Sequence, residues 1–197
     1  MTHPSKRWHV APAAPSNHIE SVSHMKLHPI VVQLLYNRGM TDPDRITAFL
    51  NGGEAESDPF DLADMETAVA RIMQAIRADE RIVVYGDFDA DGITATVLLA
   101  QTLRALGARV RAYIPHRVDE GYGLYKEILT RLANHGADLI VTVDCGIRSV
   151  DEIEHANQLG LDVIITDHHT VGDQLPQAVA VIDPQRTDSA YRFRNLS

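Results

Sequence analysis

The pattern of apolar and polar residues changes character near residue 80. Before this point apolar residues recur at helical spacing, and after it short apolar runs alternate with helical stretches. Short strands that alternate with helices are typical of a parallel α/β sheet whose strands are buried on both faces. The pattern therefore predicts a parallel β-sheet flanked by helices, preceded by a small helical N-terminal subdomain.

Five apolar runs fit buried strands, and three longer stretches between them fit helices. The expected strands are Arg81–Tyr85, Val110–Ile114, Leu139–Val143, Val163–Thr166 and Val179–Ile182. The expected helices are Ile93–Leu106, Lys126–His135 and Val150–Leu159. Gly107 and Gly160 directly follow two of these helices, at the position where glycine commonly ends a helix.

The N-terminal part carries weaker helical signals. Residues 1–27 are rich in Pro, Ser, Ala and His without any period, and we expect them to be a disordered lead-in. Helices are expected over His28–Arg38, Pro43–Leu50 and Met65–Ile76. Asp42 and Asp64 stand where a capping side chain is expected. The resulting division is a helical segment over residues 28–79 and an α/β domain over residues 80–197.

The composition fits a globular chain, but one that is not broadly basic. The sequence is 45% hydrophobic and carries a net charge of -9. Because non-specific DNA affinity comes from lysine and arginine, this charge counts against a surface built wholly for nucleic acid, unless carboxylates hold cations or DNA binds elsewhere. The sequence has no apolar run of about 18 residues and no secretory core, so a cytoplasmic protein without membrane contact is expected. The single cysteine excludes a zinc site of several thiolates.

Acidic residues and histidines follow three of the expected strands. Asp87, Asp89 and Asp91 follow the first strand, Asp144 follows the third, and Asp167, His168 and His169 follow the fourth. The carboxyl ends of parallel strands meet at one edge of the sheet, where ligands bind. Carboxylates and imidazoles suit manganese or magnesium, and two ions that share an aspartate polarise a phosphodiester and supply hydroxide. A lone aspartate after a strand is usually a cap or a turn residue, but the coincidence of three clusters favours a metal site.

Two other interpretations of these residues are disfavoured. The stretch from Asp87 to Gly92 mimics the opening of a calcium-binding EF-hand loop, but position twelve is Leu98 rather than glutamate, and a strand precedes the motif. Cys145 follows an apolar strand and has no evident base in its segment, so a buried structural thiol is favoured over a nucleophile. The sequence contains neither a phosphate-binding loop nor a dinucleotide fingerprint, which disfavours nucleoside triphosphate chemistry.

A glycine-containing loop follows the second expected strand. In it, Arg117 could hold a phosphate through two hydrogen bonds, while Gly121 and Gly123 let the loop approach that phosphate. An ordinary surface arginine explains Arg117 equally well. Arg117 is therefore a candidate phosphate or DNA contact.

Four segments of the chain resemble the DHH phosphoesterase family. They are Val84–Ala95, Glu120–Leu124, Val143–Gly146 and Thr166–His169, the last of which contains the Asp-His-His triplet that names the family. Together with the helical lead-in that ends in Asp58-Pro59-Phe60, they resemble the RecJ-type branch of this family. The resemblance covers nearly everything after about residue 27, and several ordered motifs are more specific than any one of them.

The resemblance implies a phosphoesterase that depends on Mn²⁺ or Mg²⁺, with two ions in the complete enzyme. It places Asp87, Asp89, Asp91, Asp144 and His168 in the metal site. It also implies that Asp89, His168 and His169 are catalytic, with His169 a ligand, an acid or a phosphate contact. Tyr85 stands where many relatives carry a histidine, so one metal contact of the family is expected to be absent or replaced by nearby aspartates.

RecJ-type enzymes degrade single-stranded DNA from the 5′ end in recombination and repair, and the resemblance implies this activity and substrate. A single-strand-binding protein or a helicase is a further candidate partner. Family members continue into a further motif aspartate, a second domain and an oligonucleotide-binding barrel, so we expect a truncated chain whose own activity is open.

Two alternatives to the exonuclease remain. One is a catalytically inactive DHH module that serves as a binding scaffold, and the other is a small-substrate phosphodiesterase or pyrophosphatase. A scaffold has no use for clustered carboxylates that repel one another, which speaks against the first alternative. The helical lead-in and the Glu120–Leu124 segment favour the RecJ type over the second.

Overall fold

The chain divides into two compact units, Met1–Glu56 and Ser57–Ser197. The computed structural model describes residues 9–52, 57–116, 121–194 and 196. No helix in these ranges is both long enough and apolar enough to cross a membrane.

The first unit is helical. Its elements are α1 (Ser16–Ser21), η1 (Ser23–Met25), α2 (Pro29–Asn37) and α3 (Pro43–Leu50). As predicted, Asp42 caps α3, because its Oδ1 accepts a hydrogen bond from the backbone N of Asp44 (2.9 Å). The sequence pattern predicts a disordered lead-in up to residue 27, whereas residues 16–25 contain helices. The physical reason is that Val22 is buried in a small core with Val32, Leu35 and Ile46.

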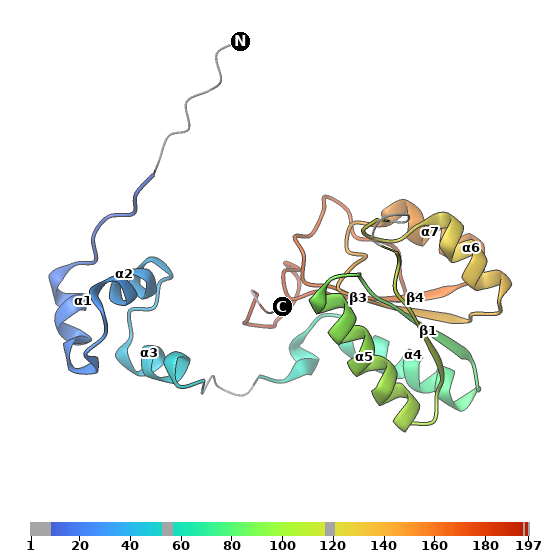
Figure 1. Cartoon of the computed structure of the whole chain (residues 1–197), viewed down its shortest axis with the longest axis horizontal. Coiled ribbons are helices and arrows are strands. Elements are labelled where there is room, and N and C mark those ends of the chain that lie inside the picture. The colour runs from blue at the N-terminus through green and yellow to red at the C-terminus, as the bar shows by residue number, and fades with distance from the viewer. Residues whose placement is uncertain (1–8, 53–56, 117–120, 195, 197) are drawn as a thin grey trace, which may run out of the picture. The chain divides into compact units, whose positions relative to one another are not determined.

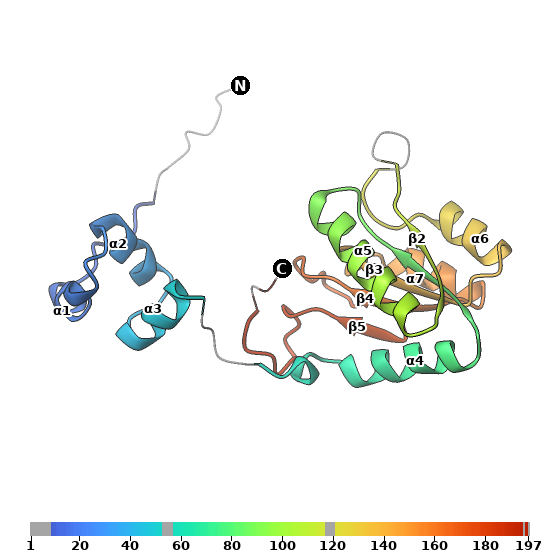
Figure 2. The same cartoon turned by 60° about the horizontal axis from the view of Figure 1, so that its bottom comes forward.

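The second unit is built on a five-stranded, all-parallel sheet, which confirms the predicted fold class (Figure 1). Its strands are β1 (Arg81–Tyr85), β2 (Arg109–Tyr113), β3 (Leu139–Val143), β4 (Asp162–Thr166) and β5 (Ala180–Ile182). The strand order is β2-β1-β3-β4-β5, so β2 and β5 form the two edges (Figure 2). Every strand lies within one residue of its predicted bounds.

Helices cover both faces of the sheet (Figure 1). The unit begins with η2 (Pro59–Asp61), and its helices are α4 (Met65–Arg77), α5 (Ala90–Ala105), α6 (Lys126–Asn134) and α7 (Val150–Gln158). Successive strand residues point to opposite faces, so Ile82 and Val84 pack in the cluster of α4 and α5, whereas Val83 and Tyr85 pack in the cluster of α6 and α7. Burial of both faces explains the continuous apolar runs of the strands.

Two helices begin differently from the prediction. Helix α5 begins three residues before the expected Ile93, because the side chain of Asp89 accepts hydrogen bonds from the backbone N of Asp91 (2.9 Å) and Gly92 (3.0 Å). Asp64 does not cap α4 through its side chain. Its Oδ2 instead accepts hydrogen bonds from the backbone N of Val181 (3.1 Å) and from Nη1 of Arg186 (2.6 Å). Asp64 therefore ties the start of α4 to the C-terminal part of the unit.

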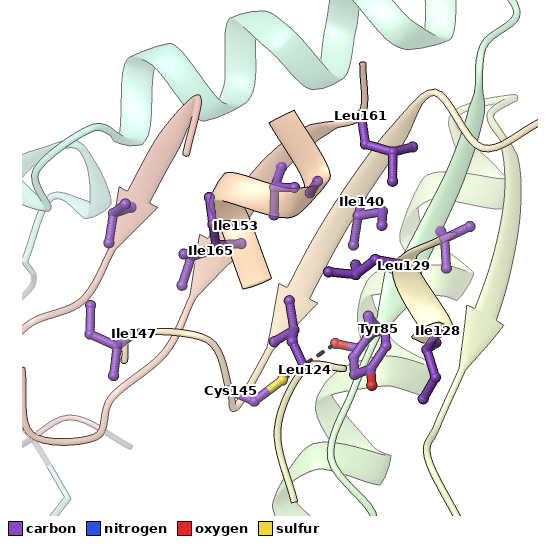
Figure 3. Packing of buried hydrophobic residues seen from close by; sticks show 14 residues of the cluster. Tyr85, Leu124, Ile128, Leu129, Ile140, Cys145, Ile147, Ile153, Leu161 and Ile165 are labelled. Carbon is purple, nitrogen blue, oxygen red and sulfur yellow. Dashed lines mark hydrogen bonds between the residues drawn. The ribbon is translucent and has the colours of Figure 1, made fainter. Parts of the chain in front are cut away.

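Tyr85 and Cys145 lie inside the cluster on the α6 and α7 face (Figure 3). The hydroxyl of Tyr85 donates a hydrogen bond to the backbone O of Gly123 (3.0 Å), so this side chain belongs to the core. The thiol of Cys145 lies 3.9 Å from the backbone O of Tyr85. Burial raises the pKa of this thiol well above its ordinary value. Cys145 is therefore a buried thiol, as the sequence favours.

Candidate metal centre

The candidate centre lies where the strand order of the sheet reverses. From β1 the chain crosses to β2 on one side, and β3 then pairs with β1 on the other side. In open parallel sheets, ligands bind at the carboxyl ends of the strands at such a switch point. The turn with Asp87 and Asp89 leaves β1 here, and Asp144 leaves β3 directly beside it.

Three carboxylates converge at this point. Asp87, Asp89 and Asp144 each place one oxygen so that these three atoms lie within 4.8 Å of one another. Asp87 is 3% exposed, and its Oδ1 is buried without a hydrogen-bond partner among the described residues. An unpaired buried carboxylate oxygen is unfavourable unless a cation or a donor satisfies it. The donor set therefore fits a divalent cation.

A close turn holds the first two carboxylates in place. Asp89 caps α5, and Gly92 lies in the first turn of this helix against Asp87. A Cβ atom at Gly92 would lie 2.6 Å from the backbone O of Asp87 and 2.7 Å from its Cα and Cβ. Only glycine permits this approach, so the sequence of the turn is tied to the position of the Asp87 carboxylate.

His168 joins the carboxylates from the neighbouring strand. Asp144 has a left-handed backbone (φ 61°), and its backbone N donates to the backbone O of Thr166 (3.0 Å), which anchors the end of β3 to β4. Oδ1 of Asp144 then lies 2.8 Å from Nε2 of His168. The same Nε2 lies 3.5 Å from Oδ2 of Asp91. His168 is thus in contact with acidic residues that follow two different strands.

Electrostatic repulsion acts on Asp144. Burial raises the pKa of its carboxyl group, and the negative charges of Asp91 and Asp89 raise it further, although the hydrogen bond with His168 opposes this effect. A carboxylate held among like charges resists ionisation unless a positive charge is close. A divalent cation would relieve this repulsion.

His169 is held by Asp167, a buried carboxylate that directly follows β4. The side chain of Asp167 is fully buried (0% exposed). Its Oδ1 accepts a hydrogen bond from the backbone N of His168 (2.7 Å) and lies 2.7 Å from Nδ1 of His169, while its Oδ2 accepts from the backbone N of Ile147 (3.0 Å). Burial alone would lower the pKa of His169, but the hydrogen bond and the charge of Asp167 raise it overall. His169 therefore keeps its positive charge to a higher pH than an ordinary imidazole.

A small cavity of about 270 Å³ adjoins His169. Tyr122 and Gly123 line it from the glycine-containing loop, and the hydroxyl of Tyr122 lies 3.4 Å from Nδ1 of His169. Burial raises the pKa of Tyr122, so its phenol remains a hydrogen-bond donor. This loop thus reaches His169 through Tyr122, whereas Arg117, the predicted phosphate contact, lies outside the described residues.

Asp183 is a further acidic residue near this edge. It directly follows β5 and is 0% exposed. Its Oδ1 accepts a hydrogen bond from the backbone N of Gln185 (2.7 Å), and Nε2 of Gln185 donates to the backbone O of His168 (2.5 Å). Burial raises the pKa of Asp183 to about 6. The signal that identifies the other clusters, an acid directly after a strand, is present here too and could have identified it.

The structure thus brings most of the predicted residues together. The two groups whose donor atoms lie within 4.8 Å of one another are Asp87, Asp89 and Asp144, and Asp144, His168 and His169. Asp144 belongs to both groups. Asp91 is in neither group, but its carboxylate faces His168 at 3.5 Å.

The sequence of the second unit matches a known family. Residues 81–191 match the DHH family, N-terminal domain. The single-stranded-DNA-specific exonuclease RecJ of Bacillus subtilis (strain 168) is 42% identical over 174 residues, which cover 88% of this chain and 22% of that protein. The enzyme of the same name from Escherichia coli (strain K12) is 39% identical over 173 residues, which cover 87% of this chain and 30% of that protein.

Solved structures show the same likeness. A crystal structure of exonuclease RecJ bound to manganese has a TM-score of 0.63 and 41% identity, and the match covers 68% of this chain and 34% of that chain. RecJ from Thermus thermophilus in complex with Mn²⁺ has a TM-score of 0.67 and 30% identity, and the match covers 96% of this chain and 28% of that chain. The chain therefore spans between 22% and 34% of the length of these four relatives.

Proposed function

This chain belongs to the DHH family, and from this premise we propose that it carries the metal centre of a 5′ to 3′ exonuclease that hydrolyses phosphodiester bonds in single-stranded DNA, in recombination and repair. The curated relatives that match most of the chain are named single-stranded-DNA-specific exonucleases. The observation that carries the proposal is the meeting of Asp87, Asp89 and Asp144 with His168 at one edge of the sheet.

The proposed metal ligands share hard oxygen or imidazole donors. They are Asp87, Asp89, Asp91, Asp144 and His168. Such a set suits Mn²⁺ or Mg²⁺, and two solved relatives are described as complexes with Mn²⁺ and Mg²⁺. Two bound ions would polarise the scissile phosphate and activate the attacking water.

The protein's own residues contribute position and charge. Asp89 and His168 hold the centre at the switch point, and Asp89 does so from a capping position that fixes its side chain. His169 is held through Nδ1 by Asp167 and carries a proton to a higher pH than usual, so it can stabilise the charge of a phosphate oxygen. Asp167 is a positioning residue in this proposal because it acts through His169.

The substrate and partners follow from the same proposal. Single-stranded DNA is the proposed substrate, and Arg117 is the proposed phosphate contact. The finer proposals are a single-strand-binding protein or a helicase as partner, and the cytoplasm as location. They rest on the family resemblance together with the DNA-processing names of the relatives.

A nuclease assay with a matched histidine control tests the proposal. The chain is incubated with Mn²⁺ and a 5′-phosphorylated single-stranded oligonucleotide, and released mononucleotides are measured. H168A should lower the rate by about 10²-fold or more, because it removes charge stabilisation at the reacting phosphate. H24A, which changes an exposed histidine in η1, should retain the parental rate.

Calorimetry with Mn²⁺ separates the alternatives. Saturable Mn²⁺ binding with cleavage of dinucleotides or pyrophosphate, but not of longer DNA, would favour a small-substrate enzyme. Mn²⁺ binding without any cleavage by a full-length protein that contains this chain would favour the binding scaffold. A folded H168A chain with parental turnover would contradict the assigned site.

A further inference from the structure

A second hollow lies beside the edge strand β2, on the face of the sheet that α6 covers. It has a volume of about 730 Å³ and is lined by β1, β2 and α6. Four arginines line it, Arg81, Arg109, Arg111 and Arg131, together with His135, and none of the described residues that line it is acidic. The chain as a whole carries a net charge of -9, so this hollow concentrates positive charge on an otherwise acidic protein.

Strand register explains why the arginines gather on one face. Arg81 of β1 pairs with Arg109 of β2, and Val83 pairs with Arg111. Because side chains alternate between faces, these residues share the α6 side of the sheet with Val83. Helix α6 adds Arg131 one turn before His135, at helical spacing.

Three of these guanidinium groups are held in place by neighbours, and for Arg109 the neighbour is an acid, because its Nη1 lies 3.0 Å from Oδ2 of the exposed Asp79. Nη1 of Arg81 donates to the backbone O of His135 (2.8 Å). Nη2 of Arg131 donates to the hydroxyl of Tyr113 (2.7 Å), and its guanidinium lies 5.4 Å from the centre of the Tyr113 ring. The positive charges of the hollow are therefore arranged before any ligand arrives, which reduces the ordering cost of binding.

The strand beside the hollow is an edge strand, and of its outward backbone groups the N of Val110 already donates to the backbone O of Ala108 (3.1 Å). Among the described strands, β2 pairs with β1 alone, and none of its five residues is fully buried. An edge strand presents unpaired N–H and C=O groups that can pair with another chain. Charged side chains on an edge usually discourage such pairing, but here they line a hollow that also contains Val83 and Leu132. They repel a basic strand and attract an acidic one.

We propose that this hollow, with the edge of β2, binds an extended acidic segment of a partner protein, which pairs with β2 as an added strand. Main-chain hydrogen bonds to the edge would supply affinity, and acidic side chains that alternate along the segment would reach Arg111 and would compete with Asp79 for Arg109. Single-stranded nucleic acid fits less well, because it uses aromatic rings as stacking platforms. The Tyr113 ring lies under Arg131 and 5.1 Å from the Tyr85 ring, so both rings and the guanidinium already pack together.

The test uses the full chain and a fluorescent peptide of about eight residues in which glutamate and valine alternate. Fluorescence anisotropy should show saturable binding, and R111E should weaken it about tenfold or more. R104E makes the same change in charge at an exposed position of α5, on the other face of the sheet, and should change the affinity less than about twofold.

Peptide variants test the mode of binding. A peptide in which lysine replaces glutamate should not bind, and a peptide N-methylated at alternate residues should bind at least about tenfold more weakly, since it keeps its charge but loses strand hydrogen bonds. R111Q provides a second variant if R111E does not fold. Parental Mn²⁺ binding by the variant shows that its metal centre is intact.

Three outcomes would overturn the proposal. The first is the absence of saturable binding by the glutamate peptide. The second is an equal loss of affinity in R111E and R104E, which would indicate a general charge effect. The third is tighter binding of oligothymidylate that displaces the peptide and is weakened by R111E, which would assign the hollow to nucleic acid. None of these outcomes bears on the metal centre, which lies at the carboxyl ends of the strands.

Discussion

Nε2 of His168 lies 2.8 Å from Oδ1 of Asp144, although the two residues are 24 positions apart in the sequence. The sheet produces this contact, because β3 and β4 are neighbours and the backbone N of Asp144 bonds to the backbone O of Thr166 (3.0 Å). The contact therefore depends on main-chain pairing that persists when either side chain is changed. Substitutions at these positions should remove ligands while they leave the fold in place.

D144A should bind Mn²⁺ at least about tenfold more weakly than the parent, because Asp144 belongs to both groups of candidate ligands. The variant should remain folded, since burial and neighbouring negative charges already disfavour the charged form of the carboxyl group that it removes. Isothermal titration calorimetry measures the affinity, and D151A, which removes an exposed carboxylate of α7, is the control. Equal affinities for D144A and D151A would refute the shared role of Asp144.

D167N should lower the pKa of His169, because the charge and hydrogen bond of Asp167 are what raise it. In the parent, the resulting ion pair stabilises the fold below the ordinary histidine pKa of 6.5, and the contribution is lost as the pH rises through the raised pKa. Histidine NMR titration in the presence of a chelator measures the effect. D151N should leave the His169 titration unchanged, and an unshifted His169 in D167N would refute the assignment.

D183N should stabilise the protein near neutral pH. Burial raises the pKa of Asp183 from 3.8 to about 6, so the folded state disfavours its charged form. Protonation of Asp183 stabilises the folded state fully below pH 3.8, the ordinary pKa of aspartate. This stabilisation is lost as the pH rises through about 6. Asparagine removes this penalty, so the gain should be about 1–3 kcal/mol at about pH 7.5 and small near pH 4.

Urea unfolding in the presence of a chelator measures the D183N effect at each pH. D173N changes an exposed aspartate and should show no such pH dependence. A stability gain for D183N that is the same at both pH values would show that burial of the charge is not its cause.

G92A should destabilise the fold by about 1–3 kcal/mol and weaken Mn²⁺ binding, because the new Cβ would lie 2.6 Å from the backbone O of Asp87. To relieve this clash, the turn that positions Asp87 and Asp89 must shift. G172A is the matched control, since its Cβ would have no neighbour closer than 3.8 Å. Similar unfolding curves for both variants would contradict the tight packing of the turn.

Much of the sheet could be predicted because its signals are local. The five residues of β1 and of β3 match their predicted bounds, since a strand buried on both faces is a continuous apolar run. The convergence of Asp87 and Asp144 also follows from sequence, because parallel strands all end at one edge. The sequence therefore predicts which strand each candidate ligand follows, but it does not predict the distances between the ligands.

The remaining features depend on contacts between distant residues. Asp64 looks like a helix cap from its neighbours, but its partner Arg186 is 122 positions away. Val22 lies in a stretch without any period, yet the core formed by α2 and α3 buries it. Asp167 carries the same local signal as a ligand, and only the structure places it under His169. Local patterns cannot specify such partners.

The burial of Cys145 makes its thiol a natural probe of local opening of the fold. Cys145 is the single cysteine in the sequence, and it is 0% exposed. Its raised pKa suppresses formation of the reactive thiolate. A thiol reagent can therefore modify the chain only after the cluster on the α6 and α7 face has opened. At low reagent concentration, the modification rate reports the population of the open form. At high reagent concentration, it reports the rate at which the open form appears. Opening kinetics next to the candidate metal centre can be followed in this way without introducing any label.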